Sequence, residues 1–231
     1  MRLSVLDLTA EMPDLFAGLP RASRQIIDWL SPAIPEAEFS AHDISGGAAL
    51  PEFGMFDGII LSGSEFGVYD HPDWMPRLRD FLRDLRAADV PTFGICFGHQ
   101  IMAETWGGRA ELARGGKAVG VRKFLVQGEV VNAYVWHQDQ VTEMPPKAQV
   151  LGEAPYCLYG VIEYPFAAMS VQFHPEFTDT QLRAMFDRGR DQIITGAEVD
   201  EALRSFEGNA VSPALMRRET AAFFRKFLPK V

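Results

Sequence analysis

The sequence has few cysteines and no pattern typical of a metal site. Only two cysteines, Cys96 and Cys157, occur in 231 residues. Two thiols cannot build a disulfide-rich scaffold or complete a four-thiolate zinc site. No cluster of His, Asp and Glu has metal-ligand spacing either, so we expect neither a metal nor another cofactor. What remains to be decided is whether one of the two thiols does chemistry.

A basic surplus and long apolar runs are also missing. The chain has 22 Lys and Arg against 31 Asp and Glu, a formal net charge of -9. Nucleic-acid-binding proteins usually carry a basic surplus, so we expect no nucleic-acid partner. No apolar run is long enough to span a bilayer, and Met1–Leu8 lacks the apolar region of a secretory leader. We therefore expect a cytoplasmic protein without membrane contact.

Strand and helix patterns alternate over the first half of the chain. This alternation predicts a mostly parallel sheet covered by helices on both faces. The second half changes to short strand patterns, which indicate antiparallel additions, and ends in helical patterns. We predict an open α/β fold of the flavodoxin-like kind, with one domain over residues 1–194 and a helical extension over 195–231 packed on it. The strand patterns lie at 2–8, 38–43, 56–61, 90–95, 118–126, 130–136, 149–153, 158–163 and 167–173. The helical patterns lie at 21–30, 74–88, 98–106, 180–194, 198–206 and 213–228.

Cys96 lies where an apolar strand pattern gives way to a helix, in Gly94-Ile95-Cys96-Phe97-Gly98. This spacing is typical of a nucleophile elbow, in which glycines relieve the crowding of a sharp strand-to-helix turn. The N-terminus of the helix favours a thiolate, and the N–H of Phe97 could stabilise an oxyanion. The alternative interpretation is a buried packing cysteine, since cysteine is among the most buried residue types.

A base for this thiol is found downstream, in Phe173-His174-Pro175-Glu176 after another apolar strand pattern. Residues two apart in an extended chain face the same way, so Glu176 can reach back to the imidazole of His174 and fix its tautomer. Taken singly, the two could be a capped histidine and a solvated acid. His99, in the first turn after Cys96, is expected to shape the site. His137 could either line the pocket or cap a loop.

These motifs together resemble those of the class I (triad) glutamine amidotransferases. Cys96-Phe97-Gly98-His99-Gln100 and Phe173-His174-Pro175-Glu176 carry the resemblance, and Ile60–Ser64 is similar to the oxyanion strand of the family. The run Gly63–Asp70 and the loop at Trp136–Val141 look closest to the standalone GMP synthase-like branch, which includes γ-glutamyl peptidases.

The resemblance implies a Cys-His-Glu catalytic triad that hydrolyses the γ-amide of glutamine. Cys96 would form a γ-glutamyl thioester, and His174, oriented by Glu176, would protonate the leaving group and then activate water. The N–H groups of Phe97 and of the turn at Gly63 and Ser64 would hold the oxyanion. The resemblance assigns the remaining substrate contacts to Gln100, His137 and Asp139.

The sequence departs from the family in two places, one in the oxyanion turn and one in its domain content. The second does not decide which substrate the enzyme uses. Ser64 and Glu65 stand where the family commonly has a second glycine and a proline. The helices after Asp179 are too short for a synthetase domain, so either a separate synthetase subunit accepts ammonia or the enzyme is simply a hydrolase. A γ-glutamyl peptidase acting on glutathione-like conjugates is the alternative. A non-catalytic binding or regulatory protein on the same fold is a third.

Overall fold

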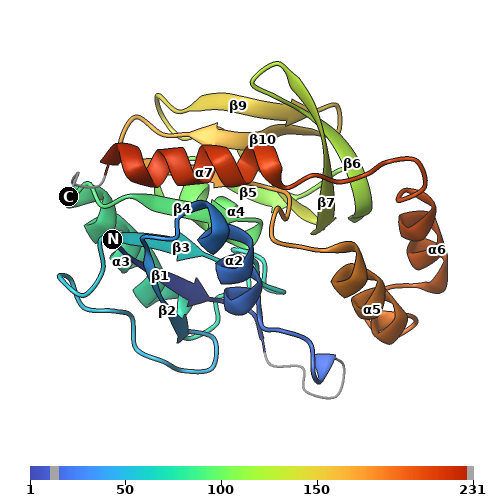
Figure 1. The fold of residues 1–231 in the computed structure, drawn as a ribbon, viewed down its shortest axis with the longest axis horizontal. Helices are drawn as coiled ribbons and strands as arrows, with labels where there is room; N and C mark the ends of the chain where they lie inside the picture. Colours follow the sequence, from blue (N-terminus) through green and yellow to red (C-terminus); the bar gives the residue numbers. More distant parts are fainter. Residues whose placement is uncertain (11–15, 228–231) are drawn as a thin grey trace.

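The computed structural model describes residues 1–10 and 16–227, in which nine strands form one sheet. Their order is β2-β1-β3-β4-β11-β10-β9-β6-β7 (Figure 1). Pairing is parallel from β2 to β11 and antiparallel from β11 to β7. This confirms the predicted α/β fold. The strands are β1 (Arg2–Asp7), β2 (Glu38–Asp43), β3 (Gly58–Leu61), β4 (Thr92–Ile95), β6 (Ala118–Val126), β7 (Glu129–His137), β9 (Gln149–Ala154), β10 (Cys157–Glu163) and β11 (Ala168–Val171).

Helices cover both faces of the parallel strands, because successive strand residues point to opposite faces. Val5 packs in a core with side chains of α2 (Ala22–Leu30) and α7 (Ala214–Phe227). Its neighbour Leu6 packs in a second core with α3 (Met75–Ala87) and α4 (Phe97–Thr105). A 3-10 turn, η1 (Ser31–Ala33), follows α2. In Figure 1, α7 crosses the same face of the sheet as α2.

Several predicted boundaries are wrong by a few residues. The helix predicted to reach residue 194 ends at Gly189, as α5 (Asp179–Gly189), and α6 (Gly196–Arg204) follows a turn. The strand predicted to reach Phe173 ends at Val171. Two short strands, β5 (Arg109–Leu112) and β8 (Asp139–Glu143), form a separate sheet that was not predicted. Their few apolar residues give little periodicity to detect. Residue 228, the predicted end of the last helix, lies outside the described residues.

The C-terminal helices pack against different parts of the sheet. A Cβ added at Gly120 of β6 would lie 2.9 Å from the Cα of Ala202, so α6 lies directly against that strand. The helix α7 instead buries Phe224 in the core that it shares with α2. Both helices thus contact the sheet, while the domain boundary at residue 194 stays a prediction. None of the helices within residues 1–10 and 16–227 is long and apolar enough to cross a membrane.

Candidate active site

Cys96 occupies a strained turn between β4 and α4. Its backbone has φ 52° and ψ -103°, in the left-handed region that residues with a side chain rarely adopt. A Cβ at Gly98 would lie 2.8 Å from the carbonyl oxygen of Leu61, and one at Gly94 would lie 2.7 Å from that of Gly98. The crowding expected of a nucleophile elbow is therefore confirmed. The turn places the Cys96 side chain in a pocket at the carboxyl ends of the parallel strands.

Cys157 is the less reactive of the two thiols. Both thiols are buried, but Cys157 does not line the pocket that contains Cys96. Burial raises the pKa of the Cys157 thiol to about 12, and the nearby Cys96 adds to this effect. A thiol that stays protonated at neutral pH is a poor nucleophile. Reactivity in this chain is therefore expected at Cys96.

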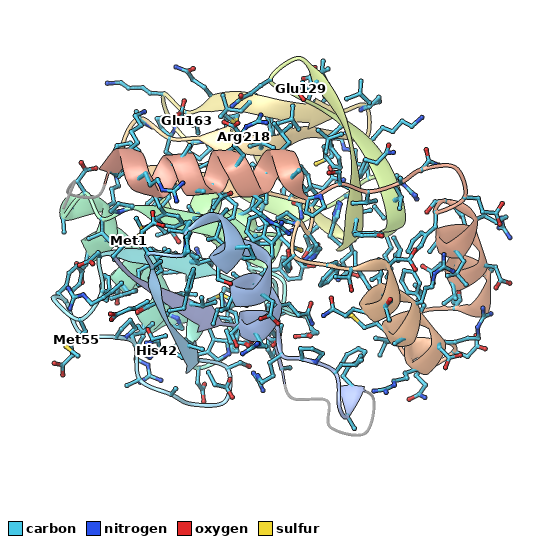
Figure 2. All side chains as sticks on the ribbon, viewed as in Figure 1. Met1, His42, Met55, Glu129, Glu163 and Arg218 are labelled. Carbon is cyan, nitrogen blue, oxygen red and sulfur yellow. The ribbon has the colours of Figure 1, made fainter. Side chains whose placement is uncertain are left out.

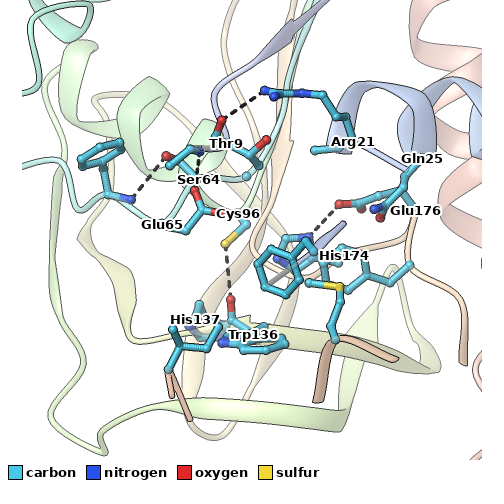
Figure 3. A pocket seen from close by; sticks show the side chains of 18 of the residues that line it. Thr9, Arg21, Gln25, Ser64, Glu65, Cys96, Trp136, His137, His174 and Glu176 are labelled. Atoms are coloured by element: carbon cyan, nitrogen blue, oxygen red, sulfur yellow. Dashed lines mark hydrogen bonds and ion pairs between the residues drawn. The ribbon is translucent and has the colours of Figure 1, made fainter. Parts of the chain in front are cut away.

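His174 and Glu176 form a buried pair beside Cys96 (Figure 3). Nδ1 of His174 lies 2.7 Å from Oε1 of Glu176, so the ring donates this proton to the carboxylate. Burial opposes a charge on His174, but the charges of Glu176 and Cys96 and hydrogen bonds to both outweigh it and raise the His174 pKa. The ring also stacks on Phe177, with ring centroids 4.1 Å apart. Nε2 is the nitrogen left to exchange a proton with Cys96.

The turn after β3 lies against the same histidine. A Cβ at Gly63 would lie 3.0 Å from Cε1 of His174 and 3.7 Å from Cβ of Cys96, so a side chain here would crowd the imidazole. The turn is tied to β1, because Ser64 Oγ donates to the carbonyl of Leu8 at 2.7 Å. It is also tied to α4 by the hydrogen bond from Gly98 N–H to Ser62 O, at 3.1 Å. The predicted oxyanion groups are thus held against the thiol.

Most of the residues predicted for the site line one pocket of about 490 Å³. The exception is Phe97, whose ring packs edge-on against Trp74 in the core, so that it can contribute only its backbone N–H. As the first residue of α4, Phe97 has no intrahelical acceptor for that N–H. The predicted residues that line the pocket are Gly63, Ser64, Cys96, Gln100, His137, Asp139, His174 and Glu176.

Asp139 and His137 line the pocket, and each is held by hydrogen bonds to neighbouring residues. The Asp139 carboxylate accepts from the hydroxyl of Tyr69 at 2.9 Å, and burial raises its pKa although this bond opposes the effect. The Asp139 carbonyl accepts from Nδ1 of His137 at 3.0 Å, while Nε2 of His137 meets the Tyr156 hydroxyl at 3.4 Å. Burial lowers the His137 pKa to about 4. His137 is therefore a neutral wall residue rather than the base.

The remaining histidines, His42, His71 and His99, do not line the pocket that contains Cys96. His99 is fully buried, contacts Ser170 at 2.8 Å, and has its pKa lowered by burial to about 3. His42 belongs to β2, at the opposite edge of the sheet from β7 (Figure 2). His174 is thus the one candidate base that the described residues bring to Cys96. Within the same described ranges, no group of three His, Cys, Asp or Glu could hold a metal ion.

Two groups that were not predicted from the sequence contact the sulfur of Cys96. The backbone carbonyl of Trp136 lies 3.9 Å from Sγ (Figure 3), and the side-chain nitrogen of Gln172 lies 3.7 Å from it. The Trp136–Val141 segment, expected to be a loop, spans the end of β7 and the start of β8. Gln172 stands two residues before His174, and this spacing was the only sign of its role in the sequence.

Comparisons with known proteins identify the family. The family model for class-I glutamine amidotransferases matches residues 37–189, so the chain belongs to that family. γ-Glutamyl peptidase 4 of Arabidopsis thaliana is 27% identical over 192 residues, which cover 76% of this chain and 71% of the peptidase. A glutamine-hydrolysing GMP synthase of Pseudomonas aeruginosa is 36% identical over 148 residues, covering 54% of this chain and 26% of the synthase.

The solved structures agree with the fold. A glutamine amidotransferase from Methylobacillus flagellatus superimposes with a TM-score of 0.73 and 18% identity, covering 99% of this chain and 95% of the other. The family predicted from the Cys96 and His174 motifs is thus confirmed, and its named relatives are enzymes. The chain spans about a quarter of the GMP synthase.

Proposed function

We propose that this protein hydrolyses γ-glutamyl amides through a thioester on Cys96, with His174 as acid and base. The observation that carries the proposal is the buried bond of 2.7 Å between His174 Nδ1 and Glu176 Oε1. It fixes the tautomer whose Nε2 can take the thiol proton. The strained turn at Cys96 and its place in the pocket support the same assignment.

The reaction proceeds in two steps, formation of a thioester and its hydrolysis. Nε2 of His174 takes the thiol proton as Sγ of Cys96 attacks the γ-carbonyl carbon, and the N–H groups of Phe97 and of the Gly63–Ser64 turn hold the developing oxyanion. The C–N bond then breaks, and His174 gives its proton to the departing nitrogen, which leaves a γ-glutamyl thioester. Water deprotonated by His174 attacks this thioester, glutamate leaves, and the proton returns to the sulfur.

The shape of the pocket favours a leaving group larger than ammonia, as in a γ-glutamyl peptidase. The pocket of about 490 Å³ extends from Cys96 to Lys117, Met185 and Ile193. Pockets of this size class hold ligands much larger than free glutamine. Because His174 protonates the departing nitrogen, the leaving group would lie near Phe177, which stacks on the ring and lines the same pocket.

The choice between the two substrates is tested by comparing glutamine with a γ-glutamyl dipeptide that has an apolar second residue. Ammonia and glutamate are both measured for each substrate. We expect a higher kcat/KM for the dipeptide, and a higher value for glutamine would contradict the larger leaving group. In that case two alternatives remain, a simple glutaminase and a glutaminase that passes ammonia to a separate synthetase subunit, and an added synthetase chain should raise the rate only in the second. The cytoplasmic location stays part of the proposal.

A further inference from the structure

Gln172 is a fully buried polar residue at the thiol to which the mechanism above gives no role. It follows directly after β11, and its exposed fraction is 0%. Its backbone N–H donates to the carbonyl of Gly160 on β10 at 2.9 Å, which fixes the segment leading to His174. A buried amide needs partners for its oxygen and its nitrogen. The two partners of Gln172 are Gln100 and Cys96.

The contacts determine which way each side-chain amide points. Nε2 of Gln100 lies 2.9 Å from the backbone carbonyl oxygen of Asp139, and a carbonyl can only accept. The same NH₂ group has a second proton, which it donates to Oε1 of Gln172 at 3.3 Å. The NH₂ group of Gln172 therefore faces Sγ of Cys96, at 3.7 Å. An amide turned the other way would place two oxygens or two nitrogens together.

The sulfur lies beside His174 and has two further polar neighbours with opposite preferences. The Trp136 carbonyl, 3.9 Å from Sγ, can accept a hydrogen bond from the thiol but repels a thiolate. The Gln172 N–H group can donate to the sulfur and interacts more strongly with the charged form. Loss of the Gln172 donor would leave His174 as the donor to the ionised sulfur, with the Trp136 carbonyl oxygen still facing it.

We propose that Gln172 is a positioning residue that holds the Cys96 sulfur through an N–H···S hydrogen bond and stabilises its thiolate. The Gln100 NH₂ group donates to the Asp139 carbonyl and to Gln172, and the Gln172 NH₂ group donates to Cys96. The Asp139 carbonyl, which can only accept, fixes the direction of these hydrogen bonds. Gln172 acts through Cys96 and does not contact the substrate carbonyl. The inference rests on the proposed role of Cys96 as nucleophile, but the state of the thiol can be measured without any substrate.

The test is the rate at which iodoacetamide alkylates Cys96, measured over a range of pH. Gln172→Met keeps the length of the side chain without the donor, and Gln172→Glu places a carboxylate there. We expect alkylation at neutral pH to fall about tenfold in Gln172→Met and further in Gln172→Glu, as for loss of one hydrogen bond to a charged group. Both rate profiles should move toward alkaline pH. Peptide mapping separates Cys96 from the buried Cys157.

Gln149→Glu, on the exposed first residue of β9, is the matched control and should alkylate at the parental rate. Thermal unfolding shows whether each variant is folded. A folded Gln172→Met protein with the parental rate and profile would overturn the inference.

A measurement on the parent protein covers the case in which the Gln172 variants do not fold. The side-chain NH₂ signals of Gln172 in a ¹⁵N NMR spectrum should shift when Cys96 ionises, and should not do so in Cys96→Ala. Signals that stay constant would overturn the inference. If hydrolysis survives loss of Cys96 while the alkylation result holds, then the proposed function is wrong and the positioning of the thiol stands.

Discussion

Nδ1 of His174 lies 2.7 Å from Oε1 of Glu176, and both side chains are buried. The carboxylate accepts this bond, so the proton sits on Nδ1 and Nε2 is free to face Cys96. The backbone of His174 is fixed as well, because its N–H donates to the carbonyl of Tyr134 on β7 at 2.8 Å. The orientation of the ring is thus set by two separate parts of the chain before any substrate arrives.

Replacing Glu176 by glutamine should remove this control while keeping the shape of the side chain. The amide introduced by Glu176→Gln could donate to the ring nitrogen and select the wrong tautomer, so we expect kcat to fall by about 10²–10⁴. Initial rates of glutamate release measure the effect. Glu129→Gln, at the exposed start of β7 (Figure 2), should match the parent. A folded Glu176→Gln enzyme with parental kcat would show that Glu176 does not orient the base.

The same pair should make stability depend on pH. Burial favours neutral His174, but Glu176 and Cys96 outweigh it and raise the pKa from 6.5 to about 10. A pKa raised by folding adds stability that is fully present below pH 6.5 and is lost as pH rises through the folded-state value. The unfolding free energy of the parent minus that of Glu176→Gln should therefore be largest at about pH 6 and decrease toward pH 10. Urea unfolding at several pH values measures it, and a difference that grows with pH would refute this explanation.

Much of the site could be predicted from sequence because it is made of short motifs, each of which is local in the chain. The turn at Cys96 and the pair at His174 and Glu176 each depend on a few consecutive residues, and the local pattern determines their geometry. Gln172 and Trp136 could not be assigned a role in this way. Their contacts to the sulfur depend on the register of β7 and β11, which lie at separate places in the sheet.

The elements of the fold also differ in how well the local sequence pattern predicts them. The long buried strands carry strong apolar patterns, and the sequence predicted them within a few residues. The strands β5 and β8 escaped prediction because they contain few apolar residues. The predicted helix 180–194 ends early at Gly189 because the chain turns there, where the N–H groups of Gln192 and Ile193 both donate to the Gly189 carbonyl.

Gly63→Ala tests the close approach of the oxyanion turn to the base. The added methyl would lie 3.0 Å from Cε1 of His174, which is tighter than an ordinary contact, so the ring or the turn must move. Misplacing a catalytic group by an ångström can cost about 10²-fold in rate, and the smaller movement needed here should lower kcat by less than that. Gly115→Ala, where nothing lies within 4 Å of the added methyl, is the control. Parental kcat in folded Gly63→Ala would mean that the turn does not contribute to the site.

Gly98→Ala should instead reduce stability. Its methyl would lie 2.8 Å from the carbonyl oxygen of Leu61, a backbone atom within the sheet that cannot easily move. Overpacking of this kind costs about 1–3 kcal/mol of unfolding free energy. Denaturant unfolding of Gly98→Ala and Gly115→Ala measures the difference. Equal stability of the two variants would mean that the elbow does not need a glycine at this position.

Trapping the γ-glutamyl thioester is the most direct test of Cys96 as the nucleophile. The enzyme is quenched with acid during turnover of a γ-glutamyl amide, digested, and analysed by mass spectrometry. We expect one γ-glutamyl group on the peptide that contains Cys96, and neither adduct nor turnover in folded Cys96→Ala. Hydrolysis by Cys96→Ala at the parental rate, or an adduct on Cys157 instead, would contradict this role of Cys96.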